Sequence, residues 1–246
     1  MAIALVTGSS KGIGLAIVRE LHKQGCQVMA CARGAEDLAA VANDIGSQNL
    51  ATTTADMAEV ADCRRVVEET LSAFGGIDIV VNNAGVYDPG SLADLAPDSW
   101  DHTFNVNVRA PYLVAQAAYP HLAQKGSGAV INIASTNGLM SEPQFAAYNA
   151  SKAALISLTE TMAVEWAASG IRVNAIAPGW VRTPLSEPWV ADLSSAQLQA
   201  LFPAGRVGLP EEIASMAAYL SSGSCPYLTG ATIRIDGGML AKHPGL

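Results

Sequence analysis

A tyrosine and a lysine stand four residues apart in the run AAYNASKAALISLTETMAVEWAAS, which follows Phe145 and has the periodicity of a helix. Because residues i and i+4 share one face of a helix, the Lys152 ammonium is expected beside the Tyr148 phenol. A neighbouring cation favours the phenolate, so the pair predicts a tyrosine that exchanges protons near neutral pH. The alternative is a surface helix on which the two side chains have no joint role.

Two further residues fit the same proton chemistry. Ser135 follows the apolar run AVINIA, so we expect it at the end of a buried strand, where its hydroxyl could share a carbonyl oxygen with Tyr148. Asn107 precedes Pro111 by four residues, and proline cannot donate the helical hydrogen bond to the Asn107 carbonyl. That oxygen could hold a water that relays protons towards Lys152, or Pro111 could mark only a bend.

The elements that must position this group begin with a glycine-rich turn, TGSSKGIG at residues 7–14, between an apolar run and a helical pattern. Glycines at such a turn permit close approach of a pyrophosphate, which rests at the positive N-terminus of the helix. The turn therefore predicts dinucleotide binding, although tight turns without a ligand also use glycine. Its spacing is G-x-x-x-G-x-G and not the G-x-G-x-x-G of ordinary dinucleotide folds.

The end of the second expected strand bears on which dinucleotide binds. A site that prefers NAD usually has an acid there, which bonds the ribose 2′-hydroxyl. This chain has Ala32 at that place and Arg33 beside it, and Lys11 adds a second cation from the glycine-rich turn. Guanidinium groups grip phosphates bidentately, so these residues predict NADP(H), with NAD(H) as the less favoured alternative. Either cation could instead be a solvated surface charge.

The third and fourth expected strands also end in candidate cofactor contacts. Asp56 could accept a hydrogen bond from an adenine amine, and with Glu59 it is expected to form a capping box for the next helix. The fourth strand ends in NNAG at 82–85, whose small residues would let a cofactor lie flat against the backbone. Tyr87, in the following loop, could form one wall of a pocket.

Short β-rich runs alternate with helical patterns along the chain, without a repeat or a linker. Apolar runs such as IDIVV and AVINIA are typical of strands buried on both faces. We therefore expect an α/β fold, a single doubly wound Rossmann-type domain over 1–246 with a seven-stranded parallel sheet and helices on both faces. The cofactor half is expected at about 1–125 and the catalytic and substrate-binding half at about 126–246. The expected strands are 2–7, 27–32, 49–54, 77–82, 128–134, 171–177 and 231–235, and the expected helices are 12–25, 36–45, 58–74, 98–123, 146–169 and 210–221.

Composition excludes several classes of partner. The 246 residues carry a net charge of −8 and no Lys/Arg run longer than two, so nucleic acid and anionic membranes are poor partners. No apolar run approaches the roughly 18 residues of a membrane span. The four cysteines form no C-x-x-C pair and the histidines show no metal-ligand spacing. With no signal-peptide pattern at the start, these features predict a cytoplasmic protein that binds no metal.

The sixth expected strand ends in the turn PGWVRTP at 178–184. Open α/β sheets bind ligands at the carboxyl ends of their strands, so this turn is expected beside the site. The segment 183–209 carries Leu185, Trp189, Leu198 and Phe202. Apolar segments of this kind often belong to the core, but its place in the chain favours a lid over the substrate.

These motifs together resemble the short-chain dehydrogenase/reductase family over essentially the whole chain. T-G-x-x-x-G-x-G, N-N-A-G, the helix asparagine, Ser135 thirteen residues before Y-x-x-x-K, and P-G after the sixth strand occur in the family's order. The resemblance implies that Tyr148 is the catalytic acid/base, that Ser135 bonds the substrate oxygen and that Asn107 supports a proton relay. It implies that Lys152 lowers the Tyr148 pKa and holds the nicotinamide ribose, and that Thr183 bonds the nicotinamide carboxamide. The run C-A-R-G resembles the corresponding segment of NADP-dependent, tropinone-reductase-like members.

The expected site has three parts. The catalytic residues are Asn107, Ser135, Tyr148 and Lys152. The cofactor-binding residues are Gly8, Ser10, Lys11, Gly12, Ile13, Gly14, Arg33, Asp56, Met57, Asn83, Ala84, Gly85, Tyr148, Lys152, Pro178, Gly179, Val181 and Thr183. The substrate pocket is formed by Tyr87, Asn137, Phe145, Trp180, Leu185 and Trp189.

The implied reaction transfers hydride between NADP(H) and a small ketone or secondary alcohol. The alternative within enzymes is a 3-oxoacyl-(acyl-carrier-protein) reductase. Members with that activity carry carrier-docking arginines at the active-site mouth, where this chain has Gly126 and Ser169, and a charge of −8 would repel an acidic carrier. A dinucleotide-sensing module without catalysis is the alternative from another class, but a sensor does not need all four catalytic residues.

The long helices 98–123 and 146–169 are rich in alanine and poor in charge, so their outer faces have little to pack against within one domain. The C-terminal segment 231–246 could pair across a two-fold axis. The family resemblance implies the same, so we expect a homotetramer, a dimer of dimers. The alternative is a monomer whose alanines simply favour helix formation.

Overall fold

A central sheet of seven parallel strands organises the computed structural model, which describes residues 1–242. The strand order is β3-β2-β1-β4-β5-β6-β7, so the chain winds outward in both directions from β1 and β4. The strands are β1 (Ile3–Thr7), β2 (Gln27–Ala32), β3 (Leu50–Thr54), β4 (Ile79–Asn82), β5 (Ala129–Ile133), β6 (Arg172–Pro178) and β7 (Thr232–Ile235). This is the doubly wound Rossmann-type fold that the sequence predicts, and the expected strands match the observed ones to within two residues.

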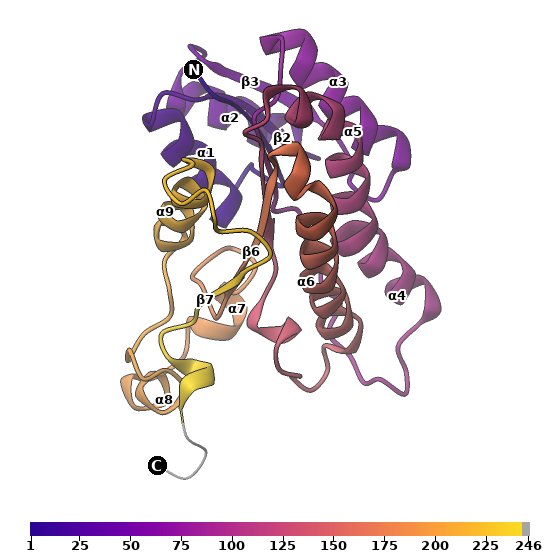
Figure 1. Ribbon diagram of the computed structural model, residues 1–246. Helices are drawn as coiled ribbons and strands as arrows, with labels where there is room; N and C mark the ends of the chain where they lie inside the picture. The colour runs from indigo at the N-terminus through magenta and orange to yellow at the C-terminus, as the bar shows by residue number, and fades with distance from the viewer. Residues whose placement is uncertain (243–246) are drawn as a thin grey trace.

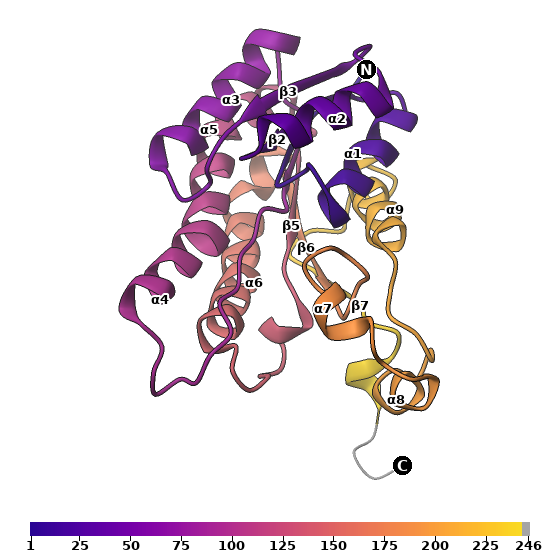
Figure 2. The same ribbon diagram turned by 180° about the vertical axis from the view of Figure 1, so that it is seen from behind.

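Helices cover both faces of the sheet (Figures 1 and 2). One face carries α1 (Gly12–Lys23), α2 (Ala35–Ile45) and α9 (Pro210–Ser221). The other carries α3 (Val60–Phe74), α5 (Ala110–Lys125) and α6 (Ala146–Trp166). The helix α4 (Pro97–Phe104) leads into the amino end of α5 through residues 105–109. No helix within residues 1–242 is both long enough and apolar enough to cross a membrane.

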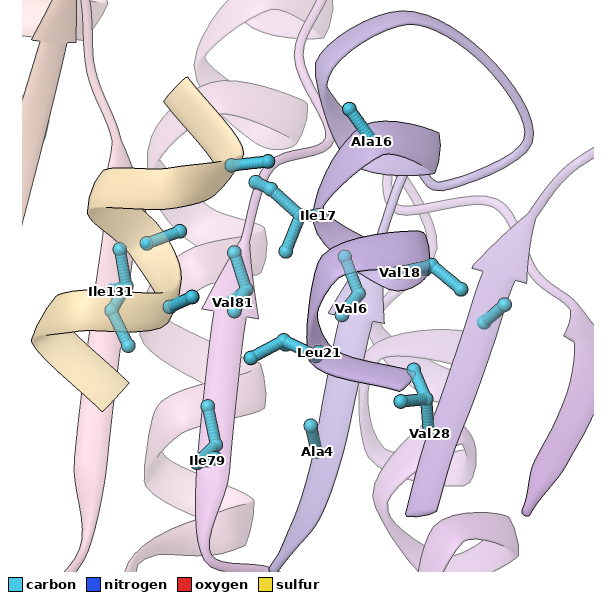
Figure 3. Packing of buried hydrophobic residues seen from close by; sticks show 14 of the residues in the cluster. Ala4, Val6, Ala16, Ile17, Val18, Leu21, Val28, Ile79, Val81 and Ile131 are labelled. Atoms are coloured by element: carbon cyan, nitrogen blue, oxygen red, sulfur yellow. The ribbon is translucent and has the colours of Figure 1, made fainter. Parts of the chain in front are cut away.

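The two faces of the sheet form two hydrophobic cores because successive strand residues point to opposite sides. In β1, Val6 belongs to the core under α1 and α9, whereas Leu5 belongs to the core under α3 and α5. Figure 3 shows Ile17 and Leu21 of α1 directed at the strands that carry Val6 and Val81. Burying each such side chain stabilises the fold by about 1.5–3 kcal/mol, so the strand ends that carry the site rest on a rigid base.

A chain of buried polar side chains fixes α6 to the sheet. Asn82 Nδ2 donates to Asn132 Oδ1 at 2.8 Å, and Asn132 Nδ2 donates to Thr159 Oγ1 at 2.8 Å. Thr159 in turn donates to the carbonyl of Leu155 at 2.7 Å. All three polar side chains are nearly inaccessible to solvent, so their hydrogen bonds link β4, β5 and α6 in one fixed arrangement.

The expected helix 98–123 is interrupted at the place where proline was expected to disturb it. Between α4 and α5 the residues Asn105–Arg109 form a π-helical turn, in which the Ala110 amide bonds the carbonyl of Asn105. Pro111 has no N–H for the Asn107 carbonyl, and the wider turn is a common response to a missing donor. The prediction of a local distortion is therefore confirmed, although its form is a π-turn and not a bend between separate helices.

The segment 183–209 folds into two short helices that the sequence did not predict, α7 (Glu187–Val190) and α8 (Ser195–Leu201). Ser194 begins α8 with a capping box to Gln197. Val190, Phe202 and Val207 form a small core of their own, joined by Leu198 and Trp180. Leu198 and Phe202 therefore stabilise the segment itself, and α7 is the part of it that approaches the site.

Candidate functional site

A cavity of about 460 Å³ lies where the carboxyl ends of the strands meet the loops that follow them. Its wall includes every residue expected in the site from the sequence except Asn107 and Asp56. One end lies at the glycine-rich turn and the β2–α2 turn, and the other lies between the loop after β4, the start of α6 and α7. The cavity thus joins the expected cofactor and substrate residues in one continuous space.

The glycine-rich turn lies against the end of β4 so closely that side chains are excluded. Gly8 has a φ of 63°, and a Cβ there would lie 2.7 Å from the Ala84 Cα. A Cβ on Gly14 would collide with the Gly8 carbonyl and with Asn83 Nδ2. These glycines let the turn pack directly on the end of β4, and Gly8, Gly12 and Gly14 also line the cavity, where a pyrophosphate can approach their backbone.

Hydrogen bonds of Asn83 and Thr7 connect the glycine-rich turn to the end of β4. Asn83 Nδ2 donates to the carbonyls of Thr7 at 2.9 Å and Gly8 at 2.8 Å. The Thr7 hydroxyl accepts hydrogen bonds from the amides of Asn83 and Ala84, both at 3.1 Å. Asn83 thus acts as a structural clamp as well as a cavity wall, a role that the small-residue argument from NNAG did not include.

The β2–α2 turn places Arg33 and Asp37 at the same end of the cavity. Arg33 is exposed, and within residues 1–242 it forms no ion pair. Ala32 is buried at the strand end, as expected. Asp37 lies in the first turn of α2, with Oδ2 3.0 Å from the place of a Cβ on Gly34, and sequence reasoning missed it.

The catalytic candidates lie together at the other end of the cavity. Ser135 lies two residues after the end of β5 and is buried, and its hydroxyl accepts a hydrogen bond from the Asn137 backbone amide at 3.1 Å. Lys152 is 3% exposed, its Nζ donates to the Ile133 carbonyl at 2.8 Å, and it lies 5.5 Å from the centroid of the Tyr148 ring. A Cβ on Gly138 would lie 2.8 Å from the Lys152 carbonyl, so the loop after Ser135 can pack directly on α6.

The electrostatics differ from the expectation in one respect. Burial raises the pKa of Tyr148, and the hydrogen bond to the Ser135 side chain opposes this only in part. Burial also lowers the pKa of Lys152, to about 8. The net direction for Tyr148 is therefore opposite to the expected lowering, because burial is the largest cause and raises the pKa of the phenol.

Asn107 lies behind the cavity and holds it in shape. Its Oδ1 accepts from the Val86 amide at 2.9 Å, and its Nδ2 donates to the Val86 carbonyl at 2.8 Å and to the Ser151 hydroxyl at 3.0 Å. Ser151 donates in turn to the Tyr148 carbonyl at 2.8 Å. The π-turn, the loop after β4 and the catalytic helix are thus connected through Asn107, and Ser151 is a positioning residue that the sequence analysis did not single out.

Aromatic rings form part of the cavity wall near Tyr148. The Phe145 ring centroid lies 5.5 Å from that of Tyr87, 6.1 Å from that of Trp189 and 6.4 Å from that of Tyr148. The Tyr87 hydroxyl donates to the Leu185 carbonyl and accepts from Trp189 Nε1, both at 3.0 Å. Tyr87 therefore connects the loop after β4 to α7 across the cavity. Of the aromatic residues expected in the substrate pocket, Tyr87, Phe145 and Trp189 meet there, whereas Trp180 lines the cavity but packs on the small core of segment 183–209.

Two expectations fail on geometry. Asp56 forms no capping box with Glu59, because Asp56 Oδ1 accepts from the Ala58 amide at 2.9 Å and Glu59 begins α3 without a side-chain cap. The neighbours of Asp56, Ala55 and Met57, line the cavity and Asp56 itself does not, so its contact with an adenine amine stays a prediction. Gly126 and Ser169 precede β5 and β6 and so lie at the amino ends of the strands, opposite this chain's own cavity mouth. Their lack of arginine therefore says nothing about the mouth of this cavity.

The residues present fit a bound dinucleotide. The glycine-rich start of α1 can accept a pyrophosphate, Arg33 stands at one end, and the Tyr148–Lys152 pair stands at the other. Within residues 1–242 no group of three His, Cys, Asp or Glu side chains could hold a metal ion. Fold and site together define the class of Rossmann-type oxidoreductases.

Comparison with known proteins agrees with this class. Residues 8–240 match the family model described as enoyl-(acyl carrier protein) reductase. The chain is 35% identical over 241 residues to dehydrogenase/reductase SDR family member 4 of Homo sapiens, covering 96% of this chain and 86% of that protein. It is 36% identical over 239 residues to a 3-oxoacyl-(acyl-carrier-protein) reductase of Staphylococcus epidermidis, covering 96% and 98%.

A solved structure gives the same result. The crystal structure of a short-chain type dehydrogenase/reductase from Mycobacterium marinum matches with a TM-score of 0.91 at 35% identity, covering 98% of this chain and 96% of that one. The chain therefore belongs to the short-chain dehydrogenase/reductase family. It is an oxidoreductase that uses a nicotinamide dinucleotide.

Proposed function

We propose that this protein interconverts a small ketone and its secondary alcohol with NADP(H), using Tyr148 as acid/base. The observation that carries the proposal is the position of the Tyr148 phenol, beside Ser135 and Lys152 at the end of a cavity that continues to the glycine-rich turn. The aromatic rings of Tyr87, Phe145 and Trp189 at the same end of the cavity suit an apolar or aromatic ketone.

Each residue of the site has a separate role in the proposed reaction. When bound, the nicotinamide accepts or supplies the hydride at the substrate carbon. In the direction of ketone reduction, the Ser135 hydroxyl donates a hydrogen bond to the substrate oxygen, and Tyr148 transfers its phenolic proton to that oxygen. Lys152 stabilises the phenolate that remains, and the Asn107 region supports its reprotonation from solvent. Thr183 and the turn at 178–181 hold the nicotinamide side of the cofactor.

The preference for NADP(H) over NAD(H) is part of the proposal. Ala32 replaces the acid that would bond a ribose 2′-hydroxyl, and Arg33 stands exposed at the cavity without an ion-pair partner within residues 1–242. Lys11 contributes a second positive charge from the glycine-rich turn. Asp37 opposes them because its carboxylate would repel a 2′-phosphate, so we propose a preference and not an absolute requirement.

Two structural features support a lid and an assembly. The segment 183–209 reaches the substrate end of the cavity through Leu185 and Trp189, which fits a lid that covers the substrate. Val164 on α6 is 81% exposed and Tyr112 on α5 is 42% exposed, which fits burial of these helices between subunits of a homotetramer.

All four cysteines are free thiols, which fits a cytoplasmic location.

A 3-oxoacyl-(acyl-carrier-protein) reductase remains the second candidate, because a relative with that name is as similar as the others. The net charge of −8 argues against an acidic carrier at long range. The test is the rate of NADPH oxidation, followed by absorbance, with a panel of cyclic, aryl and short aliphatic ketones and with acetoacetyl-carrier protein. Turnover of free ketones supports the proposal, and turnover of the carrier-bound substrate alone contradicts it.

A further inference from the structure

The substrate end of the cavity combines aromatic rings with a single carboxylate. Glu142, from the loop between β5 and α6, lines the cavity together with Tyr87, Phe145, Tyr148 and Trp189. The position of Glu142 in the sequence does not by itself indicate a role in the site. Its place in the cavity bears on which ketones the site accepts.

The rings are held by specific contacts and not by loose packing. Tyr87 and Phe145 are inclined at 57°, and Phe145 and Trp189 at 65°. The hydrogen bonds of the Tyr87 hydroxyl to Leu185 and Trp189 hold the ring between two segments far apart in sequence. Aromatic faces carry negative electrostatic potential, so a cluster of this kind attracts a cation of low hydration, such as an alkylammonium group.

The Glu142 carboxylate stands close to the reacting groups. Its Oε2 accepts a hydrogen bond from Asn137 Nδ2 at 3.1 Å, and Asn137 also bonds the Ser135 hydroxyl. The same Asn137 amide donates to Asn149 at 2.9 Å, so the carboxylate is held by a fixed neighbour. Glu142 also contributes to the raised pKa of Tyr148, as a negative charge facing the phenol would.

No positive side chain within residues 1–242 forms an ion pair with Glu142. Of the cations that line the cavity, Lys11 and Arg33 belong to the dinucleotide end, and Lys152 is bonded to the Ile133 carbonyl. A neutral ketone against this wall would desolvate the carboxylate and leave it with the neutral Asn137 amide and no opposite charge, which is unfavourable. A substrate with its own positive charge removes that penalty.

Resting on the proposed function, we propose that the natural substrate carries a tertiary or quaternary ammonium group, bound between the aromatic rings and Glu142 while its carbonyl meets Ser135 and Tyr148. The rings contact the alkyl groups around the nitrogen, and Glu142 supplies the opposite charge. The net charge of −8 of the whole chain attracts such a substrate at long range.

Two ketones of nearly the same shape test this directly: 1,1-dimethyl-4-oxopiperidinium and 4,4-dimethylcyclohexanone, which differ by a charged nitrogen in place of a carbon. With the enzyme and NADPH, we expect kcat/KM for the cation to exceed that for the neutral ketone at least tenfold. In Glu142→Gln this ratio should fall at least tenfold. The control is Glu68→Gln, which removes an exposed carboxylate on α3, away from the cavity and from the proposed subunit contacts, and should leave the ratio unchanged.

A binding measurement separates this inference from the proposed reaction. Calorimetric titration of the enzyme–NADP+ complex with the unreactive 1,1-dimethylpiperidinium should show binding that weakens at least tenfold in Glu142→Gln. Faster turnover of the neutral ketone than of the cation would overturn the inference and leave the ketone reductase standing. Glu142-dependent binding with no turnover of either ketone would support the cation site and count against the proposed reaction. Neither binding nor turnover would overturn both.

Discussion

Lys152 is the residue whose charge is least compatible with its surroundings. Its pKa falls from 10.5 to about 8 through burial alone. One pKa unit corresponds to about 1.4 kcal/mol, so at pH 7 the protonated lysine destabilises the fold by about 3 kcal/mol relative to the unfolded chain. Lys152→Met should therefore raise the free energy of unfolding at pH 7 by about 1–3 kcal/mol while abolishing activity.

The pH dependence of this effect has a defined sign. Below pH 8 the lysine is protonated in both the folded and the unfolded chain, so the difference between variant and wild type is constant. Between pH 8 and 10.5 the unfolded chain binds more protons than the folded one, so wild-type stability gains from this group as pH rises. Urea unfolding at pH 7 and pH 9.5 should show the advantage of Lys152→Met shrinking, with exposed Lys23→Met as the control. A variant less stable than wild type at pH 7 would contradict the account.

Substitutions of Arg33 and Asp37 should change kcat/KM with NADPH in opposite directions. Arg33→Ala should lower kcat/KM with NADPH at least tenfold and change kcat/KM with NADH less than threefold, because only the 2′-phosphate loses a partner. Asp37→Asn should raise kcat/KM with NADPH severalfold, since it removes a like charge from the same end of the cavity. Steady-state kinetics with both cofactors measures each ratio. Equal losses with NADPH and NADH in Arg33→Ala would show that the arginine does not recognise the phosphate.

At the scale of elements, the catalytic helix α6 depends on the buried chain Asn82–Asn132–Thr159. Thr159→Val keeps the shape of the side chain but leaves Asn132 Nδ2 without its acceptor, which should lower the free energy of unfolding by about 1–3 kcal/mol. Thr159→Ser keeps the hydroxyl and should lower the free energy of unfolding by less. Thr161→Val is the matched control, because Thr161 also bonds the carbonyl four residues back but is exposed. Equal urea midpoints for the variants at 159 and 161 would exclude this role for the network.

The elements that could be predicted are those whose signals are local. The apolar strands, the glycine-rich turn and the Tyr148–Lys152 spacing each follow from a few adjacent residues, and the structure has them where the sequence places them. The helices α7 and α8 lie between prolines in a segment whose apolar residues pack on each other, so no single periodicity revealed them. Glu142 was missed because its importance depends on which rings it meets in the folded chain.

Two errors have a common physical origin. The Tyr148 pKa lies above its ordinary value and not below it because burial, which the spacing of Tyr148 and Lys152 does not report, is the largest cause of the shift. Asp56 was expected to cap α3, but its carboxylate bonds the amide two residues on, and Asp62 accepts from its backbone amide. In both cases several interactions act on one group, and the sequence pattern indicated only one of them.

At the scale of the whole molecule, the outer faces of α5 and α6 carry the prediction of assembly. Val164 and Tyr112 are exposed on these helices, and β7 at the edge of the sheet is half-buried, with Arg234 exposed. Residues 231–242 of the C-terminal segment are described, and 243–246 lie outside the described residues. Sedimentation equilibrium at micromolar concentration should give about four times the 25.4 kDa of one chain. Val164→Asp should weaken the assembly, whereas Leu92→Asp, exposed in the loop after β4, should not. A single 25.4 kDa species in the wild type would refute the tetramer.

The central claim is that the Tyr148 phenol transfers the proton while other groups hold the substrate and the cofactor. Tyr148→Phe removes one oxygen atom and leaves the ring contacts with Tyr87 and Phe145 in place. The decisive measurement is ketone reduction by this variant together with its affinity for NADPH, determined by fluorescence titration. The account predicts a fall in kcat of at least a thousandfold, with an NADPH dissociation constant within about threefold of the wild type. A variant that keeps a tenth of the wild-type kcat would contradict it.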